Sequence, residues 1–532
     1  MGLQQITGNE IAAGSIAASD LASSLAITGD VTISGLTVGK GGGAVSNNTA
    51  VGYQAGFSNT TGTPNTYLGY QAGYTGTTAN EITAIGYYAL RLNTGNSNTA
   101  VGERSLAANS TGNNNTATGS YCLPVNTTGS SNAAYGRETL SANTTGSYNT
   151  AYGQAALFSN TTASDNTAVG YQALYSTVTG ASCTAVGTGA LYSNTAAENS
   201  AFGRSALNAN TTGTYNTALG QASLSANTTG GSNAAGGRAS LLSNTTGSNN
   251  TAFGTDALRL NTTASSNTAV GYQAAYSNTT GQGITAIGKS VLVANTTGNA
   301  NVGVGGTWDG NLSGALISNT TGSSNVAMGV AALSGNTTGS SNVGIGHLAG
   351  TGITTGSFNN ILGSQNTTLT TGEYNIQIGR FANASASSVS YALMINSDNT
   401  ARTDKGSSTG FIFTGGGMFQ GNNSANWSTT SDRRLKKNIV DNNTGLDKIN
   451  AIQVRNFEYR TAEEITDLPK DQAVERTGVQ LGAIAQELQQ VLPECVKTES
   501  TGVMTVDTDN LTWYLINAVK ELNAKITALE NK

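Results

Sequence analysis

A five-residue element, Asn-x-Ala-x-Gly, recurs along most of this 532-residue chain, as at positions 48–52 and 267–271. Its glycine returns 20 times between positions 52 and 379, mostly at steps of 17 and occasionally of 16 residues. These glycines stand at 52, 69, 86, 102, 119, 136, 153, 170, 187, 203, 220, 237, 254, 271, 288, 305, 329, 346, 363 and 379. Self-similarity at such a period predicts a solenoid, because a unit this small buries a core only by stacking on its neighbours.

One repeat unit reads N-T-A-V-G-Y-Q-A-L-x-x-N-T-T-G-x-x. We expect a short strand, a turn at the glycine, a second short strand at the Ala-Leu pair and a turn at Asn-Thr-Thr-Gly. Asn and Gly tolerate left-handed backbone at the turns, and small Ala and Val side chains suit a narrow core. Asn and Thr side chains stacked one per coil are expected to form ladders.

Composition excludes several other classes of protein. Gly accounts for 69 residues and Pro for only 4, and Gly does not fall at every third position as collagen requires. The strict register of Ala, Val and Leu argues against disorder, and no apolar run is long enough for membrane insertion. Three distant cysteines, Cys122, Cys183 and Cys495, indicate buried thiols rather than a zinc site or a disulfide framework. No ligand spacing predicts a metal or another cofactor, and the net charge of −5 without a basic patch in the repeats makes nucleic acid an unexpected partner.

Charge divides the chain near residue 430. Residues 431–532 hold 13 of the 24 Lys and Arg residues and 16 of the 29 Asp and Glu residues. We therefore predict four segments: an N-terminal attachment or capping segment at 1–40, a repetitive β-solenoid shaft at 41–380, a β-rich neck or tip at 381–430, and a mixed α+β domain at 431–532.

The last segment is predicted to end in a parallel coiled coil. Apolar residues recur there at alternating steps of four and three, the spacing of a coiled-coil seam. These residues are Leu515, Val519, Leu522, Ile526 and Leu529. A chain that ends in this way is expected to be an oligomer.

The C-terminal segment resembles the intramolecular chaperone, an auto-processing peptidase, found at the C-terminus of phage tail fibres, tailspikes and endosialidases. The resemblance rests on Ser-Asp-Arg-Arg-Leu-Lys-Lys-Asn-Ile at 431–439, Leu-Asp-Lys-Ile at 446–449, Phe-Glu-Tyr at 457–459, Gly-Ala-Ile-Ala-Gln-Glu at 482–487 with Leu-Pro-Glu at 492–494, and Asp-Thr-Asp-Asn-Leu at 507–511 before the terminal helix. Taken together and in this order, these motifs make a specific pattern.

The resemblance implies a homotrimer and a single self-cleavage. Three copies would align the nascent fibre, after which Ser431 as nucleophile and Lys436 as general base would cut the chain at the Ser431-Asp432 junction or on the N-terminal side of Ser431. A Lys can serve as base when burial lowers its pKa. The only histidine, His347, lies in the repeats. The alternative is that the basic run from Arg433 to Lys437 is simply solvated, with Ser431 as a helix cap.

The repeats resemble the head repeats of trimeric autotransporter adhesins, which carry a related Asn-Ser-Val-Ala-Ile-Gly element. That resemblance implies a trimeric parallel β-roll, with a triangular β-helix of intertwined chains as the rival geometry.

Receptor-binding residues are expected at two places. The interval between Gly305 and Gly329 is lengthened to 24 residues by an insertion that carries Trp308 and Asp309; a loop that pins adjoining chains is the alternative. The predicted neck or tip is rich in large side chains, among them Phe411, Phe413, Phe419 and Trp427. Tyrosines that follow the unit glycine, such as Tyr53 and Tyr70, form rows that either contact sugar rings or merely cover the coil edge.

These observations favour a bacteriophage tail fibre that would be assembled in the host cytoplasm and carried on the virion. It would dock through its N-terminus on a tail or baseplate protein and bind a bacterial surface glycan or protein receptor. A tailspike depolymerase is the alternative, but it needs paired carboxylates, and the few acids of the repeats do not gather in one column. A bacterial trimeric adhesin is a further alternative, for which the sequence lacks a signal peptide and a membrane barrel.

Overall fold

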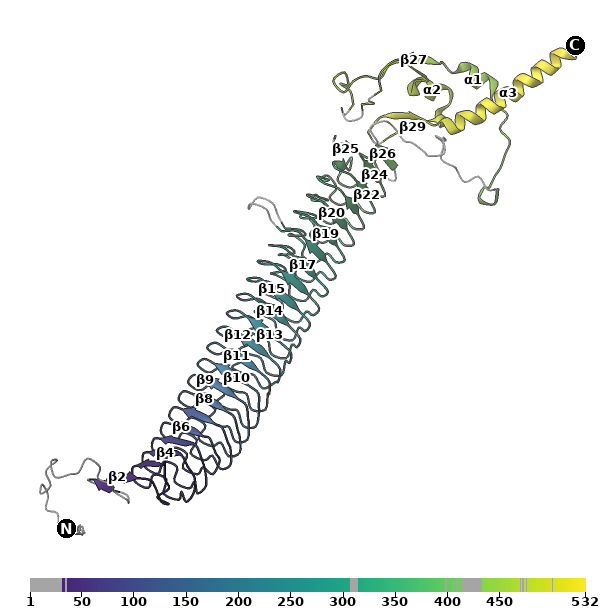
Figure 1. Cartoon of the computed structure of the whole chain (residues 1–532). Coiled ribbons are helices and arrows are strands. Elements are labelled where there is room, and N and C mark those ends of the chain that lie inside the picture. The colour runs from purple at the N-terminus through teal and green to yellow at the C-terminus, as the bar shows by residue number, and fades with distance from the viewer. Residues whose placement is uncertain are drawn as a thin grey trace, which may run out of the picture. The chain divides into compact units, whose positions relative to one another are not determined.

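The computed structural model describes residues 31–33, 36–306, 314–397, 400–404, 406–407, 410–413, 433–468, 470, 473–474, 476–499 and 501–532. The chain divides into two compact units, residues 1–250 and 251–532. Each unit contains a parallel β-solenoid with strands stacked side by side (Figure 1), and the two units together hold about 20 turns. The predicted mostly β solenoid, followed by a small region with a few helices, is confirmed.

The first unit contains strands β1 to β14. Their bounds are β1 (Val31–Ile33), β2 (Leu36–Gly39), β3 (Thr49–Val51), β4 (Asn65–Leu68), β5 (Ile82–Ile85), β6 (Thr99–Val101), β7 (Thr116–Thr118), β8 (Ala133–Tyr135), β9 (Thr150–Tyr152), β10 (Thr167–Val169), β11 (Thr184–Val186), β12 (Ser200–Phe202), β13 (Thr217–Leu219) and β14 (Ala234–Gly236). Strands β1 and β2 form an antiparallel pair, and β2 also pairs antiparallel with β3. The first parallel strand is thereby covered rather than left as an open edge.

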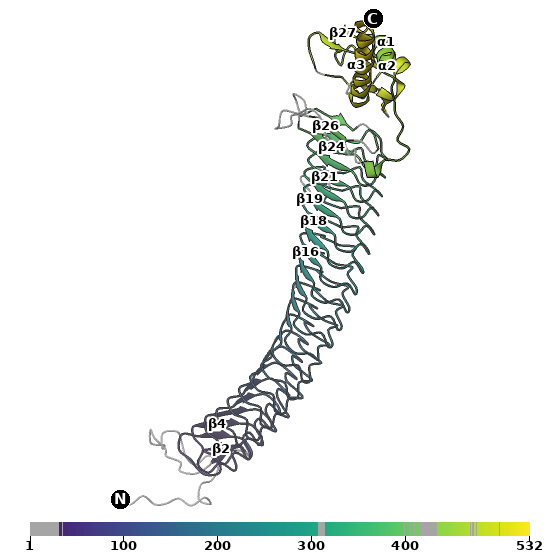
Figure 2. The same cartoon turned by 90° about the vertical axis from the view of Figure 1, so that its right-hand side faces the viewer.

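The second unit contains the remaining strands of the solenoid and the C-terminal elements. The solenoid strands are β15 (Thr251–Phe253), β16 (Thr268–Val270), β17 (Thr285–Ile287), β18 (Val302–Val304), β19 (Val326–Met328), β20 (Val343–Ile345), β21 (Asn360–Leu362), β22 (Ile376–Ile378), β23 (Ala382–Asn383), β24 (Leu393–Asn396), β25 (Arg402–Thr403) and β26 (Gly410–Phe413). Figure 2 shows strands such as β16, β18, β19, β21, β24 and β26 stacked along one side of their coils.

The parallel sheet continues past the last unit glycine, Gly379. Strand β24 pairs in parallel with β22, and β26 pairs in parallel with β24. The Asn-x-Ala-x-Gly pattern is absent here. The side chains from Leu393 to Asn396 still alternate in burial, and their strand continues the parallel pairing. The sequence repeat therefore ends before the parallel sheet does.

Most coils have one strand rather than the two that the repeat pattern predicts; toward the end of the described solenoid, β23 and β25 form a second parallel pair. Strands in successive coils pair in register, as Ala100 pairs with Ala117 in β6 and β7. The Ala-Leu pair instead lies in a turn, because its leucine adopts left-handed backbone, for example φ +52° at Leu157. A left-handed residue costs roughly 1–2 kcal/mol, but burying a leucine side chain contributes roughly 1.5–3 kcal/mol. Leu157 is fully buried, so its burial offsets the backbone strain.

The core of most coils is a thin layer of one strand Ala and one leucine that follows a small residue such as Ala, Ser or Cys. Ala100, Ala117 and Ala134 are fully buried, as are the leucines Leu106 and Leu123. The small Ala side chains let the turn approach the strand closely, as the sequence suggests. The three cysteines are also buried and free, and burial raises the pKa of the Cys122 thiol to about 12.

Two buried asparagine ladders hold successive coils together. In the first, the side-chain oxygen of the strand-leading Asn98 accepts the backbone N–H of Asn115 at 2.9 Å. In the second, the amide nitrogen of Asn126 donates to Oδ1 of Asn109 at 2.7 Å. Both amides of a coil donate to one carbonyl, as Asn98 and Asn109 do to Gly112 O at 2.8 Å. The predicted ladders are present, and they satisfy buried polar groups that would otherwise destabilise the core.

The outer surface of the parallel sheet is free of charge. Within the described residues, strands β3 to β22 contain no Asp, Glu, Lys or Arg. The residue before the unit glycine points outward and is often a large exposed apolar side chain. These include Leu68, Tyr152, Val169, Phe202 and Leu219 in the first unit and Phe253, Ile287, Met328 and Ile345 in the second. Charged residues of the coils, such as Arg104 and Glu138, lie in the loops instead.

Candidate functional site

The C-terminal region folds around a small apolar core. It contains η2 (Arg433–Leu435), α1 (Leu446–Ala451), β27 (Arg455–Phe457), β28 (Gln480–Gly482), α2 (Ala485–Val491), η4 (Pro493–Cys495), β29 (Val496–Thr498), β30 (Met504–Val506) and α3 (Thr508–Glu530). Leu488, Leu492 and Cys495 form the buried centre, and Tyr514 of α3 packs against it. Pro493 ends α2 as the sequence predicts, because it cannot continue the helical hydrogen-bond ladder. The core therefore ties the terminal helix to α2 and η4.

Polar contacts fix the elements around this core. The Arg455 guanidinium holds the Glu487 carboxylate through two hydrogen bonds of 3.1 and 3.0 Å, joining β27 to α2. Lys448 Nζ donates to the carbonyl of Val491 at 3.0 Å at the C-terminal end of α2, where a cation is favoured. Each of these two contacts joins segments that belong to different sequence motifs.

Helix α3 is held at its N-terminal half by a further set of contacts. The hydroxyl of Tyr514 donates to Oε1 of Glu494, which lowers the pKa of that carboxyl and raises the pKa of the tyrosine. Asn517 Nδ2 donates to the carbonyl of Asn442 at 2.6 Å. Helix α3 is thereby anchored to Asn442, in the segment that follows the basic run from Arg433 to Lys437. The candidate base, Lys436, lies in that run.

The two candidate catalytic residues are only partly within the described structure. Ser431 and Asp432, the predicted nucleophile and cleavage junction, lie outside the described residues. Lys436 follows η2, its backbone N–H donates to Arg433 O at 3.2 Å, and its side chain is exposed. The dyad and its roles therefore stay a prediction.

The predicted coiled-coil residues all lie on α3 with their side chains exposed. Leu515, Val519, Leu522, Ile526 and Leu529 have exposed fractions of 51, 59, 47, 45 and 70%. An apolar stripe of this kind on a 23-residue helix is typical of a helix that packs against another one. The helix is present, while its association with other copies remains a prediction.

The receptor-binding residues predicted from the sequence fall where the structure says little. Trp308, Asp309, Phe419 and Trp427 lie outside the described residues, and Phe411 and Phe413 belong to strand β26. Receptor binding by these residues therefore stays a prediction.

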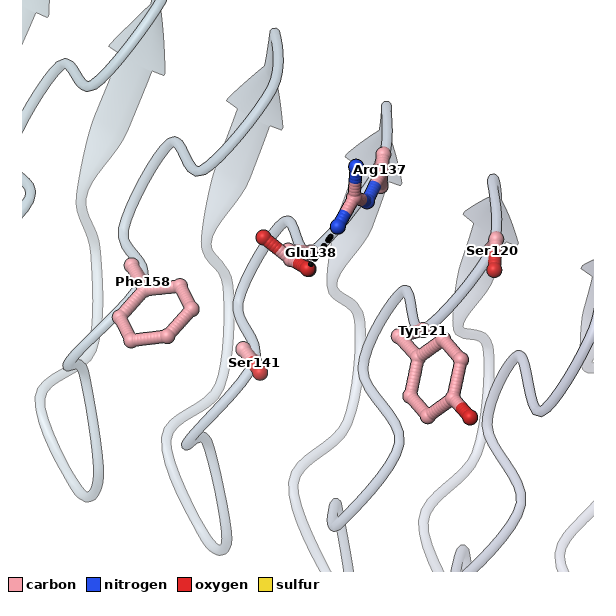
Figure 3. Close-up of a pocket in the computed structure, with 6 residues that line it drawn as sticks. All are labelled: Ser120, Tyr121, Arg137, Glu138, Ser141 and Phe158. Atoms are coloured by element: carbon pink, nitrogen blue, oxygen red, sulfur yellow. Dashed lines mark hydrogen bonds and ion pairs between the residues drawn. The ribbon is translucent and has the colours of Figure 1, made fainter.

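A surface depression of about 530 Å³ on the first unit was not predicted. It is lined by Ser120, Tyr121, Arg137, Glu138, Ser141 and Phe158, which lie on the loops after strands β7, β8 and β9 (Figure 3). Arg137 and Glu138 form an ion pair of 2.7 Å in the middle of the depression (Figure 3). The sequence does hold a signal for it: aromatic residues stand at the same place in three successive units, at Phe158, Tyr175 and Tyr192, and stop at Ser141.

The rings of these three residues form a regular stack. Phe158 and Tyr175 have ring centroids 5.0 Å apart with planes 6° from parallel, and Tyr175 and Tyr192 repeat this geometry at 5.0 Å and 4°. The tyrosines that follow the unit glycine stack in the same way, with Tyr53 and Tyr70 at 5.2 Å. Because the coils are in register, equivalent residues of neighbouring units lie in columns. A ring face is then free only where a column of aromatic residues ends.

The described residues give no sign of a metal centre or of a membrane span. Among them there is no group of three or more His, Cys, Asp and Glu side chains placed to hold a metal ion. None of the described helices combines the length and the apolar character that crossing a membrane requires.

Comparison with known families assigns the C-terminal region. Residues 431–497 match the family model described as the chaperone of endosialidase. No curated protein matches the chain. The match confirms the predicted resemblance of this region, and the β-solenoid that precedes it agrees with a fibre of the endosialidase type. Together, a β-solenoid and a chaperone of this family suggest a phage tail fibre or tailspike, a kind of protein carried on a virion tail.

Proposed function

We propose that this protein is a homotrimeric bacteriophage tail fibre that binds a bacterial surface glycan, and that its C-terminal domain trimerises the chain and then cuts itself off. The single observation that carries this proposal is the chaperone match at residues 431–497, directly after a β-solenoid. Chaperones of this family are involved in trimerisation. Ser431 and Lys436 are the proposed nucleophile and base, and the Ser431-Asp432 junction is the proposed cleavage site.

The trimer is supported independently by two apolar surfaces of the single chain. One is the stripe on α3 from Leu515 to Leu529, whose spacing of four and three suits a parallel coiled coil. The other is the outer surface of the parallel sheet, where residues such as Val169 and Leu219 are exposed without any charge beside them in the strands. Large exposed apolar surfaces mark protein contacts.

A second and a third copy of this chain are the partners that fit the sheet surface. Each coil has one outward-pointing residue before its unit glycine. Identical chains aligned in register therefore bring equivalent coils to the same level. Around a threefold axis this gives a heterologous interface that closes into a ring, with equivalent coils in register. The charged loops, which carry Arg104 and Glu138, then stay in water. The sheet surface is thus the proposed shaft interface.

Site-directed cross-linking tests this interface and the trimer. Leu219→Cys places a thiol on the proposed interface, and the matched control Gln221→Cys places one two residues later in the same coil, on a loop. With a short bis-maleimide, the first variant is expected to give dimers and trimers on a denaturing gel, and the second is expected to stay monomeric on that gel. A native mass of one chain, or equal cross-linking of both variants, would contradict the proposal.

Host binding is tested with the purified full-length protein and with labelled bacterial cells. Saturable binding that is lost after periodate oxidation of the cell-surface sugars is the expected result. Binding that survives periodate but is lost after protease treatment of the cells would assign the receptor to a protein instead.

A further inference from the structure

We propose that the depression between Tyr121 and Phe158 binds a pyranose residue of a bacterial surface polysaccharide. The inference rests on the proposed function, since it names the place on the shaft where the glycan is held. It concerns residues of the first unit only, and none of them was among the candidates that the sequence suggested.

The first part of the argument is the free face of Phe158. One face of its ring lies against Tyr175, with the ring centroids 5.0 Å apart. The equivalent residue one coil earlier is Ser141, whose side chain is too small to cover the other face. Phe158 is half-buried and held by the stack, so little side-chain entropy is lost when a ligand contacts it. A flat apolar face of this kind is what the C–H face of a sugar ring packs on.

The second part is the polar rim next to that face. Glu138 is half-buried and accepts from Arg137 through Oε1 at 2.7 Å. The pair is close to neutral and still presents carboxylate lone pairs and further guanidinium N–H groups. Adjacent donors and acceptors of this type suit the vicinal hydroxyl groups of a sugar, each of which both donates and accepts.

The third part is the opposite wall. Tyr121 is exposed, its hydroxyl lies 3.4 Å from Oε1 of Glu103, and Arg104 lies over its ring with 5.7 Å to the ring centroid. Ser120 and Ser141 add hydroxyl groups to the lining. An aromatic wall on each side of a polar floor is the composition of a saccharide site.

The depression also lies on the side of the coils that the proposed trimer leaves in water. Its residues belong to the loops that follow β7, β8 and β9, and these loops carry the charges that the sheet surface lacks. The trimer therefore offers three copies of the site, so that a long polysaccharide can gain affinity by binding more than one of them.

The test uses the full-length protein on a printed array of neutral and acidic bacterial oligosaccharides. Phe158→Ala is expected to weaken binding on the order of tenfold, since it removes the apolar face and its packing. Ser141→Tyr is the second variant: it extends the existing ring stack by one member and covers the free face of Phe158 without removing any core residue. The same loss is expected for Ser141→Tyr, with a thermal unfolding temperature at or above that of the wild type.

Phe358→Ala is the matched control. Phe358 also begins a stack of three rings, at 4.7 Å from Tyr374, and Ser341 stands one coil earlier. Its column differs from that of Phe158, and the neighbouring sequence at 337–341 and 354–357 contains no Arg or Glu. This variant is expected to bind the array like the wild type. If the wild type binds sugars and both site variants bind equally well, the site is wrong while the fibre function stands. If the wild type binds neither the array nor cells, the site and glycan recognition both fail, and the cross-linking result still decides the trimer.

Discussion

The amide nitrogen of Asn143 lies 2.8 Å from Oδ1 of Asn126, its equivalent one coil earlier. This pair is one link of the second asparagine ladder, which is interrupted at two coils of the first unit, where Gly76 and Thr177 stand at the asparagine position. Asn160, one coil before Thr177, has a buried Oδ1 without a hydrogen-bond partner. An unsatisfied buried acceptor destabilises a fold by roughly 1–3 kcal/mol.

Thr177→Asn is therefore expected to stabilise the shaft. The new amide would donate to Asn160 Oδ1, a gain of about 1 kcal/mol, less the lost bond from Thr177 Oγ1 to Asn194 O at 2.9 Å. Scanning calorimetry should show a higher unfolding temperature for this variant. Thr177→Ala, which loses the bond to Asn194 without repairing the ladder, should unfold at a lower temperature than the wild type. The opposite order of the two variants would refute the ladder account.

Gly119→Ala is expected to prevent regular stacking in its neighbourhood. Gly119 has φ +143°, and a Cβ at this position would lie 2.4 Å from the carbonyl oxygen of Gly136 in the next coil. The contact is with backbone, so neither side can yield, and a loss of more than about 3 kcal/mol follows from strain and clash together. Hydrogen exchange should show local loss of protection over β7 and β8. Ser120→Ala, one residue later, should leave the exchange unchanged.

The α3 stripe is expected to be needed for the trimer. Replacing Val519 and Leu522 by Asp places two charges per chain in the proposed seam, where they would lose hydration without gaining partners. Native mass spectrometry should then show single chains. Asn523→Asp adds a charge beside the stripe and should keep three chains together. Trimers in both variants would mean that α3 is not part of the interface.

The contact between Glu494 and Tyr514 predicts a specific dependence on pH. The hydrogen bond lowers the pKa of Glu494, whose ordinary value is 4.5, and raises the pKa of Tyr514, whose ordinary value is 10.0. The lowered carboxyl pKa gives stability that is present above pH 4.5 and is lost as pH falls through the folded-state pKa. The raised phenol pKa gives stability that is present below pH 10.0 and is lost as pH rises through the folded-state pKa.

Tyr514→Phe should therefore reduce stability between these limits and become indistinguishable from the wild type in stronger acid. Because Glu494 is exposed and Tyr514 is only partly buried, solvent screening keeps the difference small. Chemical denaturation of the two proteins at several pH values measures it. A stability difference that stays the same in acid would show that the Tyr514 hydroxyl stabilises the protein by packing rather than by this hydrogen bond.

The repeat period predicts the solenoid because every unit repeats the same buried positions, and Asn126 and Ala117 are placed correctly by that pattern alone. The second strand is predicted wrongly because an apolar pair such as Ala156-Leu157 has the same pattern in a strand and in a buried turn. Only the left-handed backbone at Leu157 distinguishes the two. The depression beside Phe158 is missed because a site between coils depends on residues 17 apart. The sequence reveals it only when residues at equivalent positions of successive units are compared.

The most direct test of the account is the intact mass of the expressed chain, compared with Ser431→Ala and Lys436→Ala. The wild type is expected to yield a body of about 430 residues and a fragment of about 100, in keeping with a serine and lysine dyad that acts once, while both variants stay whole. Native mass should show three bodies together. A wild type that stays full length as three associated chains would contradict self-cleavage and leave a permanent clamp, and a full-length single chain would contradict the fibre itself.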